Sequence, residues 1–110
     1  HPHLRFRRQR QMCIRDRSAA RRVIHPLEVS FAGDNQVNAS ILFSLKEAFY
    51  KAQFPRWREL GNFRELALSV NLAEGTADIK EMDARFDSEL EQLSFAFKIV
   101  DDFVVSLVWT

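Results

Sequence analysis

The chain has 110 residues, 46% of them hydrophobic, which suits one small globular domain and excludes two domains of ordinary size. No apolar run approaches the roughly 20 residues of a membrane span, and the single cysteine, Cys13, excludes an internal disulfide. We therefore expect a cytoplasmic protein with no membrane partner. Charge is divided unevenly, because residues 1–22 carry eight arginines and one acid, whereas the rest of the chain carries eight basic and fourteen acidic side chains.

The basic segment at the start of the chain has three readings: a nucleic-acid-binding arm, a targeting peptide, or a join between two unrelated pieces. Residues 12–17, MCIRDR, resemble the conceptual translation of a transposase adapter used to prepare sequencing libraries. We therefore interpret residues 1–17 as an artefactual or disordered segment, as arises in metagenomic assemblies, and residues 18–110 as the natural domain. On this interpretation nucleic acid is not an expected partner.

Helical patterns come first along the natural part of the chain. Residues 18–24 favour a short helix or the end of a helix, which stops before Pro26 because proline disfavours helical geometry in the residue before it. A longer helix is predicted over residues 36–53, where apolar side chains recur every three or four positions. These apolar positions are Val37, Ile41, Leu45, Phe49 and Ala52. A side-chain oxygen of Asp34, Asn35 or Asn38 is placed to cap this helix.

Two strand patterns follow, and they predict a hairpin. The first alternates apolar with small or polar residues, the period of a half-buried strand. Its apolar members are Leu66, Leu68, Val70 and Leu72. Glu74-Gly75 stands where a tight turn is expected, and residues 76–82 form the returning strand.

A second hairpin is predicted over residues 93–99 and 103–109, which alternate in the same way on either side of Asp101-Asp102. By this alternation Phe95, Phe97 and Trp109 belong to the core. The order helix, hairpin, hairpin predicts an α+β fold, in which one long helix packs on an antiparallel sheet of two hairpins.

The predicted long helix carries the candidate chemistry. Glu47 and Lys51 are four residues apart and share one face, and Lys46 flanks that face. A carboxylate suits magnesium, and lysines suit phosphate oxygens. The same spacing is typical of a surface ion pair that only stabilises the helix. On spacing alone the alternative is therefore a non-catalytic α+β interaction domain with a basic nucleic-acid-binding arm.

The full string over residues 43–51, FSLKEAFYK, resembles the signature helix of phosphopantetheinyl transferases of the surfactin/enterobactin type. That signature has an aromatic residue, a small polar residue, any residue, Lys-Glu, a small residue, two further positions and Lys. Residues 21–28, RRVIHPLE, resemble the segment that precedes this helix in the family, and residues 50–55, YKAQFP, resemble the helix exit. The resemblance implies the C-terminal half of a pseudo-two-fold transferase fold.

The resemblance also implies a reaction, in which phosphopantetheine moves from coenzyme A to a serine of an acyl or peptidyl carrier protein with Mg²⁺ as cofactor. Such enzymes would serve siderophore or polyketide biosynthesis. Carried over residue by residue, Glu47 is a magnesium ligand and Lys51 contacts the coenzyme A phosphates. Lys46 lies by the pyrophosphate, where it assists proton transfer or neutralises leaving-group charge. Glu28 is a candidate base or neighbour of the metal site.

One departure from the family pattern concerns a second metal ligand. Family members carry an upstream Gly-x-Asp motif, whose acid supplies a further magnesium ligand. Here the only acid before Glu28 is Asp16, and the first glycine is Gly33. We therefore expect a truncated protein that is inactive alone. The missing half should leave apolar surface exposed, which favours self-association.

Overall fold

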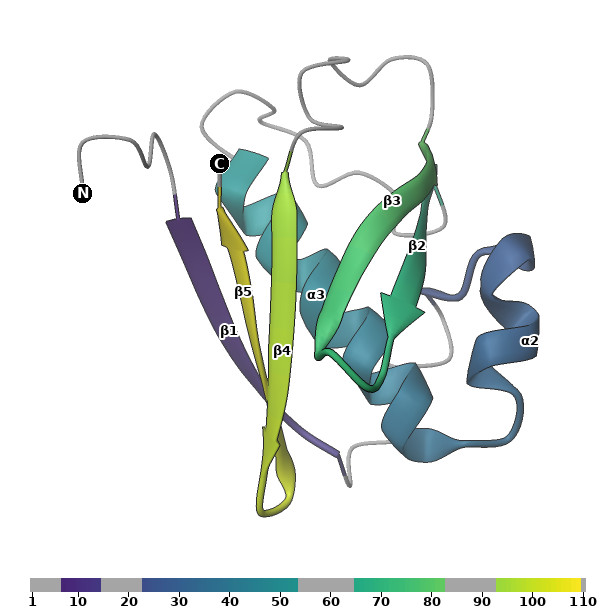
Figure 1. The fold of residues 1–110 in the computed structure, drawn as a ribbon, viewed down its shortest axis with the longest axis horizontal. Coiled ribbons are helices and arrows are strands. Elements are labelled where there is room, and N and C mark those ends of the chain that lie inside the picture. The colour runs from purple at the N-terminus through teal and green to yellow at the C-terminus, as the bar shows by residue number, and fades with distance from the viewer. Residues whose placement is uncertain (1–6, 15–22, 54–64, 83–92, 110) are drawn as a thin grey trace.

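The computed structural model describes residues 7–14, 23–53, 65–82 and 93–109. Most of the expected first helix, and Asp16 with it, lie outside these ranges. The described elements run in the following order: β1 Arg7–Cys13, η2 Pro26–Glu28, α2 Val29–Ala32, α3 Gln36–Gln53, β2 Leu66–Asn71, β3 Thr76–Met82, β4 Ser94–Val100 and β5 Phe103–Trp109. The strands form one five-stranded antiparallel sheet in the order β1-β5-β4-β3-β2. Figure 1 shows α3 crossing one face of this sheet and α2 beside β2.

Three elements were not predicted from the sequence: the short helices η2 and α2, and strand β1, which lies within residues 1–17. Strand β1 pairs with β5 over its whole length, from Arg7↔Trp109 to Cys13↔Phe103. At its end, Ile14 N donates to Asp102 O at 2.8 Å, and its carbonyl accepts from Gln36 Nε2 at 3.2 Å. The sheet therefore has one strand more than the two predicted hairpins. The origin of residues 12–17 in adapter DNA stays a prediction.

The turn between β2 and β3 is built around Asn71. Its side-chain Oδ1 accepts from Glu74 N at 3.1 Å, and its carbonyl accepts from Gly75 N at 2.9 Å. Gly75 has φ +69°, a conformation that favours glycine. The turn begins one residue after Asn71, so Leu72, which the alternation placed on the buried face, is 54% exposed.

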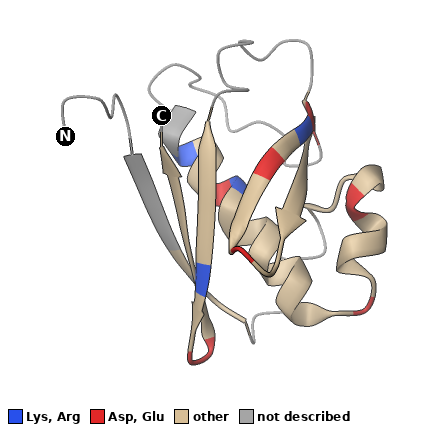
Figure 2. Cartoon of the chain, viewed as in Figure 1, with Lys and Arg blue, Asp and Glu red and all other residues tan. Residues whose placement is uncertain are grey.

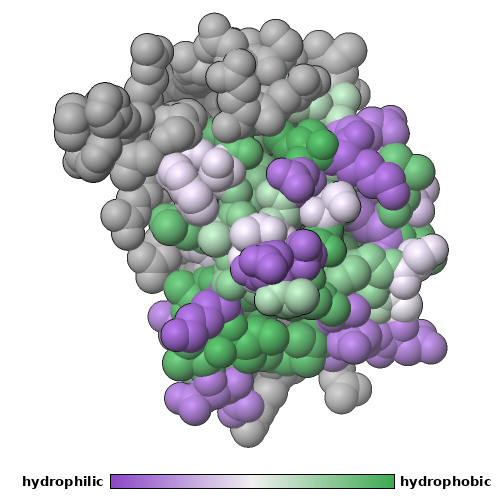
Figure 3. Space-filling model, viewed as in Figure 1, coloured by the Kyte–Doolittle hydropathy of each residue, from purple (hydrophilic) through white to green (hydrophobic). Residues whose placement is uncertain are grey.

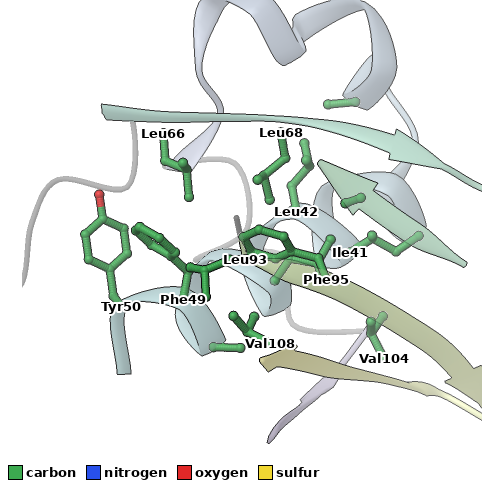
Figure 4. Close-up of a cluster of buried hydrophobic side chains, with 14 residues drawn as sticks. Ile41, Leu42, Phe49, Tyr50, Leu66, Leu68, Leu93, Phe95, Val104 and Val108 are labelled. Atoms are coloured by element: carbon green, nitrogen blue, oxygen red, sulfur yellow. The ribbon is translucent and has the colours of Figure 1, made fainter. Parts of the chain in front are cut away.

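The core lies between α3 and the inner face of the sheet, and Figure 4 shows the side chains that fill it. Leu42 and Phe49 of α3 point toward Leu66 and Leu68 of β2. The rings of Phe49 and Phe95 stack with centroids 6.3 Å apart, which joins the helix to β4. Side chains of this kind are excluded from water almost completely, and their burial is the main force that holds the helix on the sheet.

The inner face of β5 is the opposite of the one expected. Val104, Ser106 and Val108 are fully buried against α3, because the register pairs Val108 with Phe95 and Val104 with Ile99. Trp109 therefore points to the outer face and is only half-buried. Both sets of alternate residues in β5 are rich in apolar side chains, so alternation alone did not distinguish the two faces.

Candidate functional site

Helix α3 carries the motif residues, and local sequence fixes where it begins. Asn35 is its N-cap: Asn38 N donates to Asn35 Oδ1 at 3.1 Å, and Ala39 N donates to Asn35 O at 3.1 Å. The helix ends at Gln53, two residues before Pro55, as expected from the restriction that proline places on the preceding residue. The nine-residue motif thus lies wholly within regular helix.

The charged motif residues differ in exposure. Each residue advances an α-helix by about 100°, so Lys46 and Glu47 point in clearly different directions, whereas Glu47 and Lys51 share a face. Lys51 is exposed, Glu47 is half-buried and Lys46 is fully buried. Figure 2 shows that the charges of α3 gather in its C-terminal half. The face with Glu47 and Lys51 is the one that a ligand could reach.

Lys46 points into the protein, toward the segment that precedes α2. Its Nζ donates to Glu28 Oε1 at 2.5 Å and to the carbonyl of Val23 at 2.6 Å. The side chains of Lys46 and Glu28 both have 0% exposure. The sequence placed Lys46 beside the face that carries Glu47. In the structure its side chain points inward instead and contacts Glu28 directly.

Glu28 binds backbone amides as well as Lys46. It is the last residue of η2, and its Oε1 accepts from His25 N at 2.9 Å, which completes a capping box. Its Oε2 accepts from Leu68 N in β2 at 2.7 Å. Both carboxylate oxygens are therefore occupied inside the protein. Neither oxygen is directed to solvent, where a base or a metal-site neighbour would be expected.

Burial changes the acid–base chemistry of Lys46. The desolvated site lowers the pKa of its ammonium below the ordinary value of 10.5, because the charged form loses its hydration. The negative charge of Glu28 and its hydrogen bond raise the pKa and oppose this effect only in part. A buried ion pair of this kind is held by its geometry and by its additional hydrogen bonds.

Some contacts around the motif were not predicted from the sequence. The partners of the buried pair, Val23 O and Leu68 N, are backbone groups and leave no residue pattern. Ser44, the small polar residue of the motif, accepts a hydrogen bond from Ser106 Oγ at 2.7 Å. The signal for Ser106 is its place as a single polar residue among the buried apolar residues of β5.

The α3 face that carries Glu47 and Lys51 could bind magnesium only if water or substrate supplied most of the ligands. In the described ranges, no group of three or more His, Cys, Asp or Glu side chains is gathered so that it could hold a metal. Mg²⁺ commonly takes one or two protein carboxylates, with water and substrate phosphates completing its shell. Glu47, a half-buried carboxylate beside a solvent-facing lysine, fits as one such ligand.

Comparison with known proteins identifies the fold. No family model matches the sequence, and no curated protein matches it significantly. Among solved structures, the holo-[acyl-carrier-protein] synthase of Helicobacter pylori, determined with coenzyme A, superposes with a TM-score of 0.73 at 18% identity. The match covers 96% of this chain and 100% of that chain. The chain has the fold of these synthases.

Two further synthases agree with this result. The holo-ACP synthase of Plasmodium yoelii matches with a TM-score of 0.70 and 11% identity over 97% of this chain and 94% of its own. The acyl carrier protein synthase of Mycobacterium tuberculosis matches with a TM-score of 0.69 and 14% identity over 96% of both chains. At these identities the likeness concerns the fold, and the chemistry has to be argued from the residues.

Proposed function

We propose that this chain is a magnesium-dependent transferase that moves phosphopantetheine from coenzyme A to a serine of a carrier protein. One observation carries the proposal: the motif of residues 43–51 lies on α3 of a synthase fold, with Glu47 and Lys51 on its accessible face. The fold adds to the motif, because the three synthase structures described above share only 11–18% sequence identity with this chain.

The proposed chemistry is displacement at phosphorus. The serine Oγ of the carrier forms a bond to the phosphorus that bears the pantetheine arm, and the bond from that phosphorus to the bridging oxygen breaks. Adenosine bisphosphate leaves, and the serine proton is released. Mg²⁺, when bound, supplies charge neutralisation on the pyrophosphate. Glu47 would hold the metal as one ligand, and Lys51 would bind phosphate oxygens as a compact positive charge.

Lys46 and Glu28 have a weaker claim to direct chemistry. The sequence reading placed Lys46 by the pyrophosphate and Glu28 as a base or a neighbour of the metal site. Their side chains are buried against each other and against backbone groups. For either group to contact the substrate, this buried contact would have to open. We therefore assign ligand contact to Glu47 and Lys51.

The test is a transfer assay with coenzyme A, Mg²⁺ and an apo carrier protein, followed by mass spectrometry of the carrier. The chain is assayed alone and joined to an N-terminal half of the surfactin/enterobactin type. A mass gain with the chain alone would support the proposal and contradict the prediction that the truncated chain is inactive. A gain only with the joined protein would support both. No gain in either form would overturn the proposal.

Self-association and location are proposed on separate grounds. The end of the β4–β5 hairpin exposes Val100 and Phe103, which pair in register and so share one face of the sheet, and Figure 3 shows apolar side chains gathered at this end of the face. We propose that copies of the chain associate through this surface, which sedimentation of Val100→Ser against the unmodified chain would test. None of the described helices is long and apolar enough to cross a membrane. A cytoplasmic location stays a prediction.

A further inference from the structure

The contact between Glu28 and Lys46 joins three parts of the fold at one point. Lys46 belongs to α3, Glu28 ends η2, and the amide of Leu68 that Glu28 Oε2 accepts from belongs to β2. Val23, before η2, adds its carbonyl to the Lys46 ammonium. Through the carboxylate of Glu28, Lys46 of α3 is linked both to the segment that precedes the helix and to Leu68 of β2, which lies 22 residues after Lys46.

Such a contact controls a motion that apolar packing controls poorly. The hydrophobic effect that buries the core side chains of α3 is non-directional, so burial alone specifies the rotation of the helix about its axis only weakly. Hydrogen bonds to a buried ammonium are directional, and a small rotation would leave charge without a partner in a low-dielectric site. The contacts of Lys46 therefore restrain the rotational setting of α3, together with the buried Ser44–Ser106 hydrogen bond on the sheet side.

The residue after Lys46 is Glu47, and Lys51 follows one turn later on the same face. We infer that the buried Glu28–Lys46 pair is a positioning pair, which sets the rotation of α3 so that Glu47 and Lys51 present one ligand-binding face, and that it does not touch the substrate. This inference rests on the proposed function for the identity of the ligands, but the rotation it describes belongs to the fold alone.

A comparison of variants distinguishes a positioning role of Lys46 from direct contact between Lys46 and the phosphates of coenzyme A. Lys46→Met removes the ammonium and keeps the length of the side chain. Acting through position, it should lower kcat/KM about a hundredfold, the effect of a misplacement of about 1 Å at reacting groups. The same substitution is then made in the Glu47→Ala/Lys51→Ala double variant, and the Kd for coenzyme A is measured by calorimetry without metal. There Lys46→Met should change the Kd by less than about threefold, within the range in which independent effects add. A tenfold or greater weakening in that background would overturn the inference.

A second measurement follows the fold directly. In Lys46→Met, amide resonances of residues 47–51 should shift and the Leu68 amide should lose hydrogen-exchange protection, whereas Lys80→Met, which removes an exposed cation from β3, should leave both unchanged. If Lys46→Met does not fold, the double variant Glu28→Gln/Lys46→Met removes both charges and is measured in its place. Lys46→Arg, which keeps a buried cation, should recover part of the lost activity.

The two levels of proposal fail differently. Absence of transfer by the unmodified protein, alone and joined, sinks the proposed function and leaves the resonance test of the pair standing. If the unmodified protein shows transfer, but Lys46→Met has unchanged kinetics and unchanged resonances, the positioning role is wrong. The proposed function is then still supported.

Discussion

The hydroxyl of Ser106 donates to the hydroxyl of Ser44 at 2.7 Å, across the packed interface between β5 and α3. Both residues have 0% exposure and lie among apolar neighbours. Ser44 stands three residues before Glu47, so this bond holds the motif stretch of α3 against the sheet. The Glu28–Lys46 pair holds the same stretch on another side of the helix. Two buried polar contacts thus frame the motif.

The serine pair should show strong coupling in stability. Ser44→Ala leaves the Ser106 hydroxyl buried without its acceptor, and we expect a loss of about 1–3 kcal/mol in the free energy of unfolding. The double variant Ser44→Ala/Ser106→Ala removes both groups and should lose less than the sum of the single variants. Urea unfolding measures all three. Ser69→Ala, at an exposed position of β2, is the control and should lie within about 0.5 kcal/mol of the unmodified chain. Additive losses would contradict the coupling.

Glu47→Ala should separate function from folding. Glu47 is half-buried on the accessible face, so its removal should change the melting temperature little and should lower magnesium-dependent transfer about a hundredfold, in line with several kcal/mol of metal charge stabilisation. Circular dichroism and the transfer assay are run on the same preparations of the chain joined to an N-terminal half. The control is Glu74→Ala, in the exposed β2–β3 turn. Full transfer activity in Glu47→Ala would contradict the proposed metal-ligand role and would favour the reading of Glu47 and Lys51 as a surface pair that only stabilises the helix.

Gly75→Ala should weaken the sheet where the first hairpin meets β4. A Cβ there would lie 2.9 Å from the carbonyl oxygen of Phe97, on a backbone with φ +69°. Phe97 N also donates to Gly75 O at 2.8 Å, so the two backbones cannot separate without losing that bond. We expect a loss of about 1–3 kcal/mol from strain, with the close contact adding to it. Gly33→Ala has φ +47° but its nearest atom at 4.0 Å, and should lose less. Equal losses in urea unfolding would count against the close-contact explanation.

Alkaline pH should reveal the buried ammonium. Because the pKa of Lys46 is lowered in the folded state, the unfolded chain binds more protons between that lowered value and 10.5. The contribution of Lys46 to stability is therefore fully present above 10.5 and is lost as the pH falls through the folded-state pKa. The free energy of unfolding of the unmodified chain, relative to Lys46→Met, should rise as the pH approaches 10.5. A flat difference between the two would show that the pKa is not lowered.

Sequence periodicity predicted the elements whose apolar residues face one way. The range predicted for the long helix, residues 36–53, is that of α3, since Ile41, Leu45 and Phe49 must all reach the core. The four strands of the two hairpins were also expected, to within a residue or two. β1 was not, because Arg7–Cys13 has no alternating apolar pattern and owes its conformation to pairing with β5.

The candidate site was predictable in identity and less so in geometry. The motif located Glu47 and Lys51 on one face, because that relation depends only on helical spacing. The inward direction of Lys46 depends on where Glu28 lies, 18 residues earlier, after an irregular segment. Local spacing carries no information on such a tertiary contact. The two backbone partners of the pair are invisible to any reading of side chains.

The pairing of β1 with β5 has a consequence for how the protein is made. Arg7 pairs with Trp109, and Cys13 with Phe103, so every contact of this ladder spans 90 residues or more of chain (103 against 13). When all 110 residues are expressed, β1 leaves the ribosome long before β5 is synthesised and spends that time without its partner. Ladders of such long range close slowly, because the loop entropy must be lost before the contacts form. The N-terminal strand should therefore be the last part of the sheet to become resistant to protease during synthesis.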